Sequence, residues 1–80
     1  MHLRVKGLGL EDLDGLTEAF SKLPGVSGAD IEGDFENGAQ TWVVHVVDLK
    51  AMSKSLEKVD RPRKLKVVSR KGAIIDLTTK

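Results

Sequence analysis

The sequence predicts an α+β sandwich in which two amphipathic helices cover one face of an antiparallel sheet. Two segments carry apolar residues at helical spacing, and several others alternate between apolar and polar residues as half-buried strands do. Their order is strand, helix, strand, strand, helix, strand, with a short extra strand at the C-terminal end. This is the order of the ferredoxin-like βαββαβ fold, whose two right-handed crossovers put both helices on one face. Residues 1–80 are expected to form one such domain.

The first strand and helix are predicted from periodicity. Residues 2–6 alternate as a half-buried strand does. A helix follows, whose apolar face consists of Leu10, Leu13, Leu16, Phe20 and Leu23. Gly15 lies inside this helix at a cost of about 1 kcal/mol relative to alanine, which indicates close packing against a strand. Pro24-Gly25 then ends the helix.

A hairpin is predicted in the middle of the chain. In its first strand the apolar side is Ala29, Ile31, Gly33 and Phe35, and the acidic side is Asp30, Glu32 and Asp34. Asn37-Gly38 is a strong signal for a two-residue type I′ turn, because both central positions of that turn need a positive φ. Residues 40–47 then return antiparallel as the third strand, which we expect to be central together with the first.

The second helix and the last strands complete the domain. Asp48 is a plausible N-cap, and the apolar face of the helix is Leu49, Met52, Leu56 and Val59. Pro62 is expected to end this helix. Residues 65–68 alternate as a fourth strand, and Lys71-Gly72 permits a tight turn into the extra strand at 73–77.

Composition excludes several classes of chemistry. The chain has no cysteine, so it has no disulfide, no thiolate metal site and no thiol nucleophile. Three aromatic residues leave the core to leucine, valine and isoleucine. No apolar run approaches the length of a membrane span, and the N-terminus has the pattern of a strand. We expect a cytoplasmic protein that does not bind membranes.

Charge is distributed unevenly although the net charge is only +1. Residues 1–49 contain three lysines and arginines against nine acids, whereas residues 50–71 contain nine against two. An acidic front half followed by a basic segment gives the molecule a charge dipole, which bears on its partners rather than on its fold.

Three short segments resemble the heavy-metal-associated domains of copper chaperones and metal-transporting ATPases. They are Val5-Lys6-Gly7-Leu8, Leu23-Pro24-Gly25-Val26 and Glu36-Asn37-Gly38. The resemblance covers most of the chain as a pattern common to small βαββαβ domains. That family has two cysteines in the first loop, at the places of Leu10 and Leu13 here. Leucine offers no lone pair, so we expect neither a metal nor another cofactor. The resemblance implies a docking module, or a metallochaperone relative without its metal.

No enzyme is predicted. The two histidines, His2 and His45, lie on expected strands, and no serine stands in a nucleophile elbow. The alternating acids Asp30, Glu32 and Asp34 are typical of a solvated strand, and the loop pattern of calcium sites is absent.

The third strand is the most informative feature, because it is apolar on both sides. If Trp42, Val44 and Val46 face the helices, a protein-binding surface remains on the open side of the sheet, formed by Val43, His45 and Val47, with Val68 near them. The partner is then another protein or a second copy. Two alternatives stay open: a central strand tolerates valine anywhere, or the C-terminal segment covers these residues. A shift of register by one residue would instead bury His45 and expose Trp42.

Nucleic-acid binding is the second hypothesis. Its candidate residues are Arg61, Arg63, Lys64, Lys66, Arg70 and Lys71. They are suited to phosphate contacts, but the open-face positions of the first and third strands have no aromatic residue on which bases would stack. A solvated basic edge is the favoured interpretation of this segment.

Overall fold

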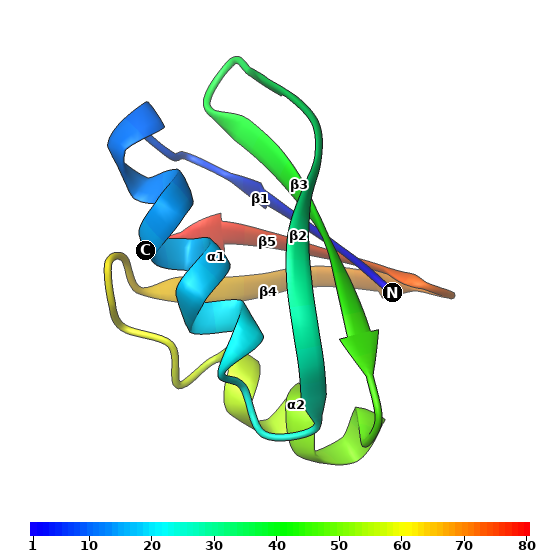
Figure 1. The fold of residues 1–80 in the computed structure, drawn as a ribbon. Helices are drawn as coiled ribbons and strands as arrows, with labels where there is room; N and C mark the ends of the chain where they lie inside the picture. The colour runs from blue at the N-terminus through cyan, green and yellow to red at the C-terminus, as the bar shows by residue number, and fades with distance from the viewer.

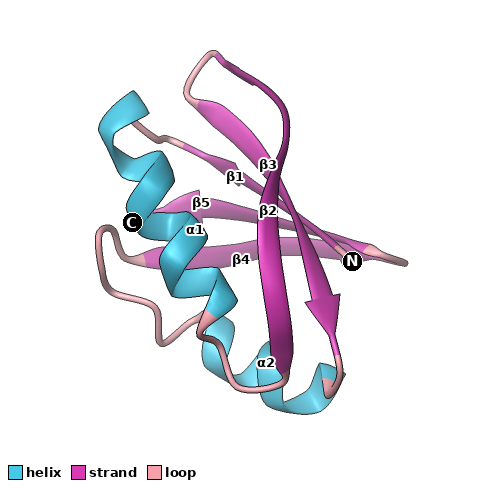
Figure 2. Ribbon diagram, viewed as in Figure 1, coloured by secondary structure: helices cyan, strands magenta, loops and turns pink.

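The computed structural model describes residues 1–80 as an α+β fold with five strands and two helices (Figures 1 and 2). The elements are β1 (His2–Lys6), a 3₁₀ turn η1 (Leu10–Asp12), α1 (Leu13–Ser21), β2 (Val26–Glu36), β3 (Ala39–Val46), α2 (Leu49–Leu56), β4 (Leu65–Lys71) and β5 (Ile74–Thr79). The α+β class predicted from periodicity is therefore confirmed, and each expected strand and helix is present.

The sheet is mixed rather than antiparallel, which corrects the expectation. Its strand order is β2-β3-β1-β5-β4. β1 pairs antiparallel with β3 but parallel with β5. The extra strand therefore enters the sheet between β1 and β4 instead of adding to its edge. Ile75 and Leu77 explain this position, because an interior strand buries both side chains almost completely and so gains more hydrophobic stabilisation than an edge strand.

One hydrophobic core lies between the helices and one face of the sheet. It joins 15 buried residues: Leu3, Val5, Leu8, Leu13, Leu16, Phe20, Leu23, Trp42, Val44, Met52, Leu56, Val59, Leu65, Ile75 and Leu77. Trp42 is fully buried, and its ring meets that of Phe20 edge to face at 5.1 Å between centroids. The indole Nε1–H donates to Thr17 Oγ1 at 2.7 Å. The register with Trp42 and Val44 toward the helices is thus the observed one.

The start of α1 differs from the prediction. The helix begins at Leu13, and Leu10 lies in the preceding 3₁₀ turn with 69% of its surface exposed. A 3₁₀ turn has three residues per turn, so it carries Leu10 away from the buried helical face. Gly15 is closely packed as expected, but against a loop: a Cβ there would lie 2.9 Å from Cγ of Pro62.

The predicted turn and cap are confirmed. Asn37 and Gly38 both have positive φ, as a type I′ hairpin turn requires. The Asp48 carboxylate accepts the Ala51 N–H at 3.1 Å and caps α2. That helix ends at Leu56, before Pro62, while Val59 still reaches the core from the following turn.

Candidate functional site: the open sheet face

The side of the sheet away from the core is covered by no helix and is called the open face here. Its residues alternate along each strand with those that point into the core. They are Asp30 and Glu32 of β2, Thr41, Val43 and His45 of β3, His2, Arg4 and Lys6 of β1, Ile74, Asp76 and Thr78 of β5, and Lys66, Ser69 and Lys71 of β4.

A central row crosses all five strands. Strand pairing puts Asp30, Val43, His2, Ile74 and Lys71 side by side in that order. Val43 is half-buried and Ile74 is 42% exposed, so the two aliphatic side chains flank His2 at the middle of the face. The row has an acid at its β2 end and a base at its β4 end.

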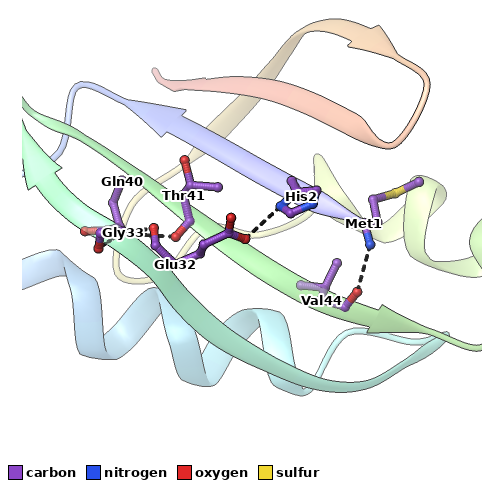
Figure 3. Close-up of polar contacts among 7 residues, drawn as sticks. All are labelled: Met1, His2, Glu32, Gly33, Gln40, Thr41 and Val44. Atoms are coloured by element: carbon purple, nitrogen blue, oxygen red, sulfur yellow. Dashed lines mark hydrogen bonds and ion pairs between the residues drawn. The ribbon is translucent and has the colours of Figure 1, made fainter.

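Short polar contacts link the side chains around this row. His2 reaches across β3, and its Nδ1 lies 2.9 Å from Glu32 Oε2 (Figure 3). Arg4 Nε donates to Asp76 Oδ1 at 2.7 Å, and Ser69 Oγ donates to Asp76 Oδ2 at 3.0 Å. The hydrogen bond from Arg4 is the main cause that lowers the pKa of Asp76, and the Ser69 hydroxyl lowers it further.

The buried Gln40 supports β2 from the other side of the sheet. Its Nε2 donates to the carbonyl oxygens of Glu32 and Gly33 at 3.0 and 3.1 Å, and to that of its neighbour Thr41 at 3.1 Å (Figure 3). Gly33 has a φ of 76°, and the β2–β3 pairing is irregular between Glu32 and Glu36. Gln40 thus satisfies backbone groups where the strand departs from regular pairing.

A shallow hollow of about 450 Å³ lies where the open face meets the β2–β3 hairpin. Arg4 and Lys6 line it from β1, and Asp34 and Glu36 line it from β2. Because both signs of charge are present, it is not the uniformly positive cradle that a phosphate group requires.

Three of the four predicted protein-binding residues share one region. Val43 and His45 project from β3, and Val47 follows at its end with 75% of its surface exposed. Val68 is 61% exposed but lies in β4, with β1 and β5 between it and β3. Val68 is therefore not near the other three, because β5 enters the sheet between β1 and β4.

Ile74 occupies the place expected for Val68, and the sequence prediction missed it. The signal was present in the alternation: if Ile75 and Leu77 point inward, Ile74 points outward. This inference needed β5 inside the sheet, beside β1, and not at its edge.

The six basic residues do not form one surface. Arg63 Nη1 donates to the buried Asp12 at 3.2 Å on the helix side, and Arg70 Nη1 donates to Ser53 of α2 at 3.3 Å. Lys66 and Lys71 lie on the open face. Arg61 is exposed beside α1, and Lys64 directly precedes β4. Strand alternation thus divides a run that is continuous in sequence.

The rest of the molecule shows neither a cluster of metal-ligating side chains nor an unpaired buried polar atom. No group of three or more His, Asp or Glu side chains is close enough to hold a metal ion. Every buried side-chain nitrogen and oxygen has a hydrogen-bond partner. None of the helices has both the length and the apolar character needed to cross a bilayer.

Comparisons with known protein families, curated proteins and solved structures found no match for the chain.

Proposed function

We propose that the protein is a non-enzymatic interaction module that binds a polypeptide through its open face. The observation that carries this proposal is the central row, in which Val43 and Ile74 are left accessible in the middle of the sheet face that no helix covers. Asp30 and Lys71 lie at the two ends of this row, and the charged groups nearest its middle are paired, Arg4 with Asp76 and His2 with Glu32. Accessible aliphatic side chains between polar ones are typical of protein–protein interfaces, whose buried part is apolar and whose rim is polar.

We also interpret the fold as an extended form of the ferredoxin-like arrangement. The order β1, α1, β2, β3, α2, β4 supports this, and β5 is then an addition that displaces β4 outward by one strand position.

A relationship with heavy-metal-associated domains stays a prediction. Cu(I) or zinc titration tests it, and a stoichiometric tight site would contradict a relative that has lost its metal.

A double substitution tests the proposed function. Val43→Lys with Ile74→Glu puts charges into the apolar centre without changing the net charge. Each new charge meets an opposite one in the neighbouring strand, because Val43 lies beside Asp30 and Ile74 beside Lys71. The fold is therefore expected to tolerate the change, which thermal unfolding verifies. Should the double variant unfold, Ile74→Glu alone serves, since that side chain is already 42% exposed.

The matched control is Leu10→Lys with Leu49→Glu. Like the face variant, it introduces one base and one acid in place of aliphatic side chains. The two leucines that it replaces are exposed, but neither lies on the open face. Tagged wild-type, face-variant and control chains are exposed to an extract of the source organism, and retained proteins are quantified by mass spectrometry. We expect at least one polypeptide, the chain itself included, to be retained by wild type and control and lost from the face variant. Equal retention by all three contradicts the proposal.

The nucleic-acid hypothesis has weaker support, because the six basic residues divide between the two sides of the sheet. A nucleic acid bound on one side of the sheet would therefore contact only some of these basic residues. Fluorescence anisotropy with single-stranded RNA at physiological salt tests it directly.

A further inference from the structure

We infer that the open face binds a second copy of this chain, face to face, about a twofold axis parallel to β1. This inference rests on the proposed function and names its partner. It follows from the order of the strands and from the charges that they carry, because a symmetric dimer must bring one surface onto itself in a self-complementary way.

The charges of the two outer strands are opposite. On the open face β2 presents Asp30 and Glu32 and no base, whereas β4 presents Lys66 and Lys71 and no acid. β1 is the middle strand, with two strands on each side. A twofold axis along β1 therefore places β2 of one copy over β4 of the other, twice in each dimer. An axis across the strands instead places acid over acid and base over base, which like-charge repulsion disfavours.

The central row is complementary under the same operation. Val43 and Ile74 flank His2 on opposite sides, so an axis through β1 brings Val43 of one copy over Ile74 of the other. At the ends of the row, Asp30 meets Lys71 of the second copy. The apolar contacts lie next to the axis and the ion pairs lie at the rim. One operation satisfies both sets of contacts. It also places Arg4 and Lys6 of β1 over their own copies, where the Arg4 charge is already compensated by Asp76, so the like charges that meet on this axis are fewer than along the two outer strands under the other axis.

Face-to-face sheets pack at an angle of about 30°, and the rows then diverge toward the margins. Asp30 and Lys71 lie two strands from the axis, roughly 10 Å away, so this rotation shifts them by about 5 Å along the strand. The flexible lysine side chain spans such a shift, and the pairing of the margins persists.

Edge-to-edge addition is the competing way to join β2 to β4, and the edges oppose it. The β2–β3 pairing is irregular near both ends of β2, and Gly33 has a left-handed φ. The β4–β5 pairing shifts between Val67 and Ser69. Irregular edges interrupt the regular ladder that a further strand needs.

The size of the face sets the strength of the dimer. Five strands about 4.8 Å apart and about 20 Å long offer on the order of 500 Å² per copy. That is below the roughly 800 Å² of a standard interface, so the dimer is expected to be weak, with a Kd on the order of micromolar or higher.

Charge reversal tests the axis. Asp30→Lys and Lys71→Asp each put two like-charge contacts into the homodimer. Sedimentation equilibrium at low salt is expected to show each variant weakened at least about tenfold relative to wild type. An equimolar mixture of the two variants restores the dimer, because both contacts of the heterodimer are then between opposite charges. The double variant Asp30→Lys/Lys71→Asp restores its own homodimer for the same reason.

The outcomes separate this inference from the proposed function. Wild-type protein that stays monomeric at millimolar concentration overturns the inference, whereas loss of a foreign partner from the face variant still supports the proposed function. Oligomers larger than a dimer would indicate association through the edge strands β2 and β4, and would overturn the twofold axis. A dimer that persists in Ile74→Glu overturns the inference and removes self-association from the open face, because this variant sets a carboxylate against Val43 of the second copy twice in each dimer.

Discussion

Replacing Thr17 by valine is expected to destabilise the fold by about 2 kcal/mol, because it leaves a buried donor without a partner. The Thr17 hydroxyl accepts from the Trp42 indole at 2.7 Å and donates to the Leu13 carbonyl at 2.9 Å. Trp42 is fully buried, so water cannot replace the hydroxyl. Valine has nearly the same shape, and packing is kept. In a domain of this size such a loss lowers the Tm by roughly 8–16 °C.

Thr17→Ser is the matched control. It keeps the hydroxyl and removes one methyl group, at a cost of up to about 0.8 kcal/mol. Urea unfolding is followed by the fluorescence of Trp42, the only tryptophan, with the m-value checked for constancy. The reasoning fails if Thr17→Val is no less stable than Thr17→Ser. It would then follow that Trp42 does not face α1, and the assignment of the open face would be wrong with it.

Two further predictions concern buried or paired carboxylates. Because Arg4 lowers the pKa of Asp76, the pair stabilises the fold above the ordinary Asp pKa near 3.9 and loses this contribution as the pH falls through the lowered value. In Arg4→Gln the midpoint of the Asp76 titration, followed by NMR, should therefore shift to higher pH. An unchanged midpoint would refute the pairing. Asp12 accepts the Gly9 N–H at 2.9 Å and pairs with Arg63, so Asp12→Ala is expected to cost about 1–2 kcal/mol in urea unfolding. Asp12→Asn keeps the contact with the Gly9 N–H and should cost less, and equal losses would count against that hydrogen bond.

Local sequence signals predicted the elements of the fold well. Alternation placed the strands, and Asn37-Gly38 fixed the hairpin because only a positive φ at both positions permits that turn. Asp48 marked the start of α2 through its own side-chain oxygen. These signals act within a few residues, so a single sequence is enough to recognise them.

The order of the strands in the sheet is not set by local sequence signals, so the sequence analysis did not predict it correctly. Nothing near residues 73–79 distinguishes an edge strand from one that enters beside β1. The choice depends on burial of Ile75 and Leu77 against side chains from distant elements. That one decision changed the candidate site, because it moved Val68 away from β3 and brought Ile74 beside His2. It also put the acidic and basic outer strands at equal distances from β1.

The account depends most on the open face being a contact surface, and intermolecular NOEs in a mixed-label sample test this directly. One copy carries ¹³C-labelled methyl groups and the other does not, at a concentration where sedimentation detects the dimer. We predict cross-peaks between the methyl groups of Val43 in one copy and Ile74 in the other, with no change at the Trp42 indole. Cross-peaks confined to the backbone of β2 and β4, or no concentration-dependent shift at Val43, His2 and Ile74 up to millimolar protein, would contradict it.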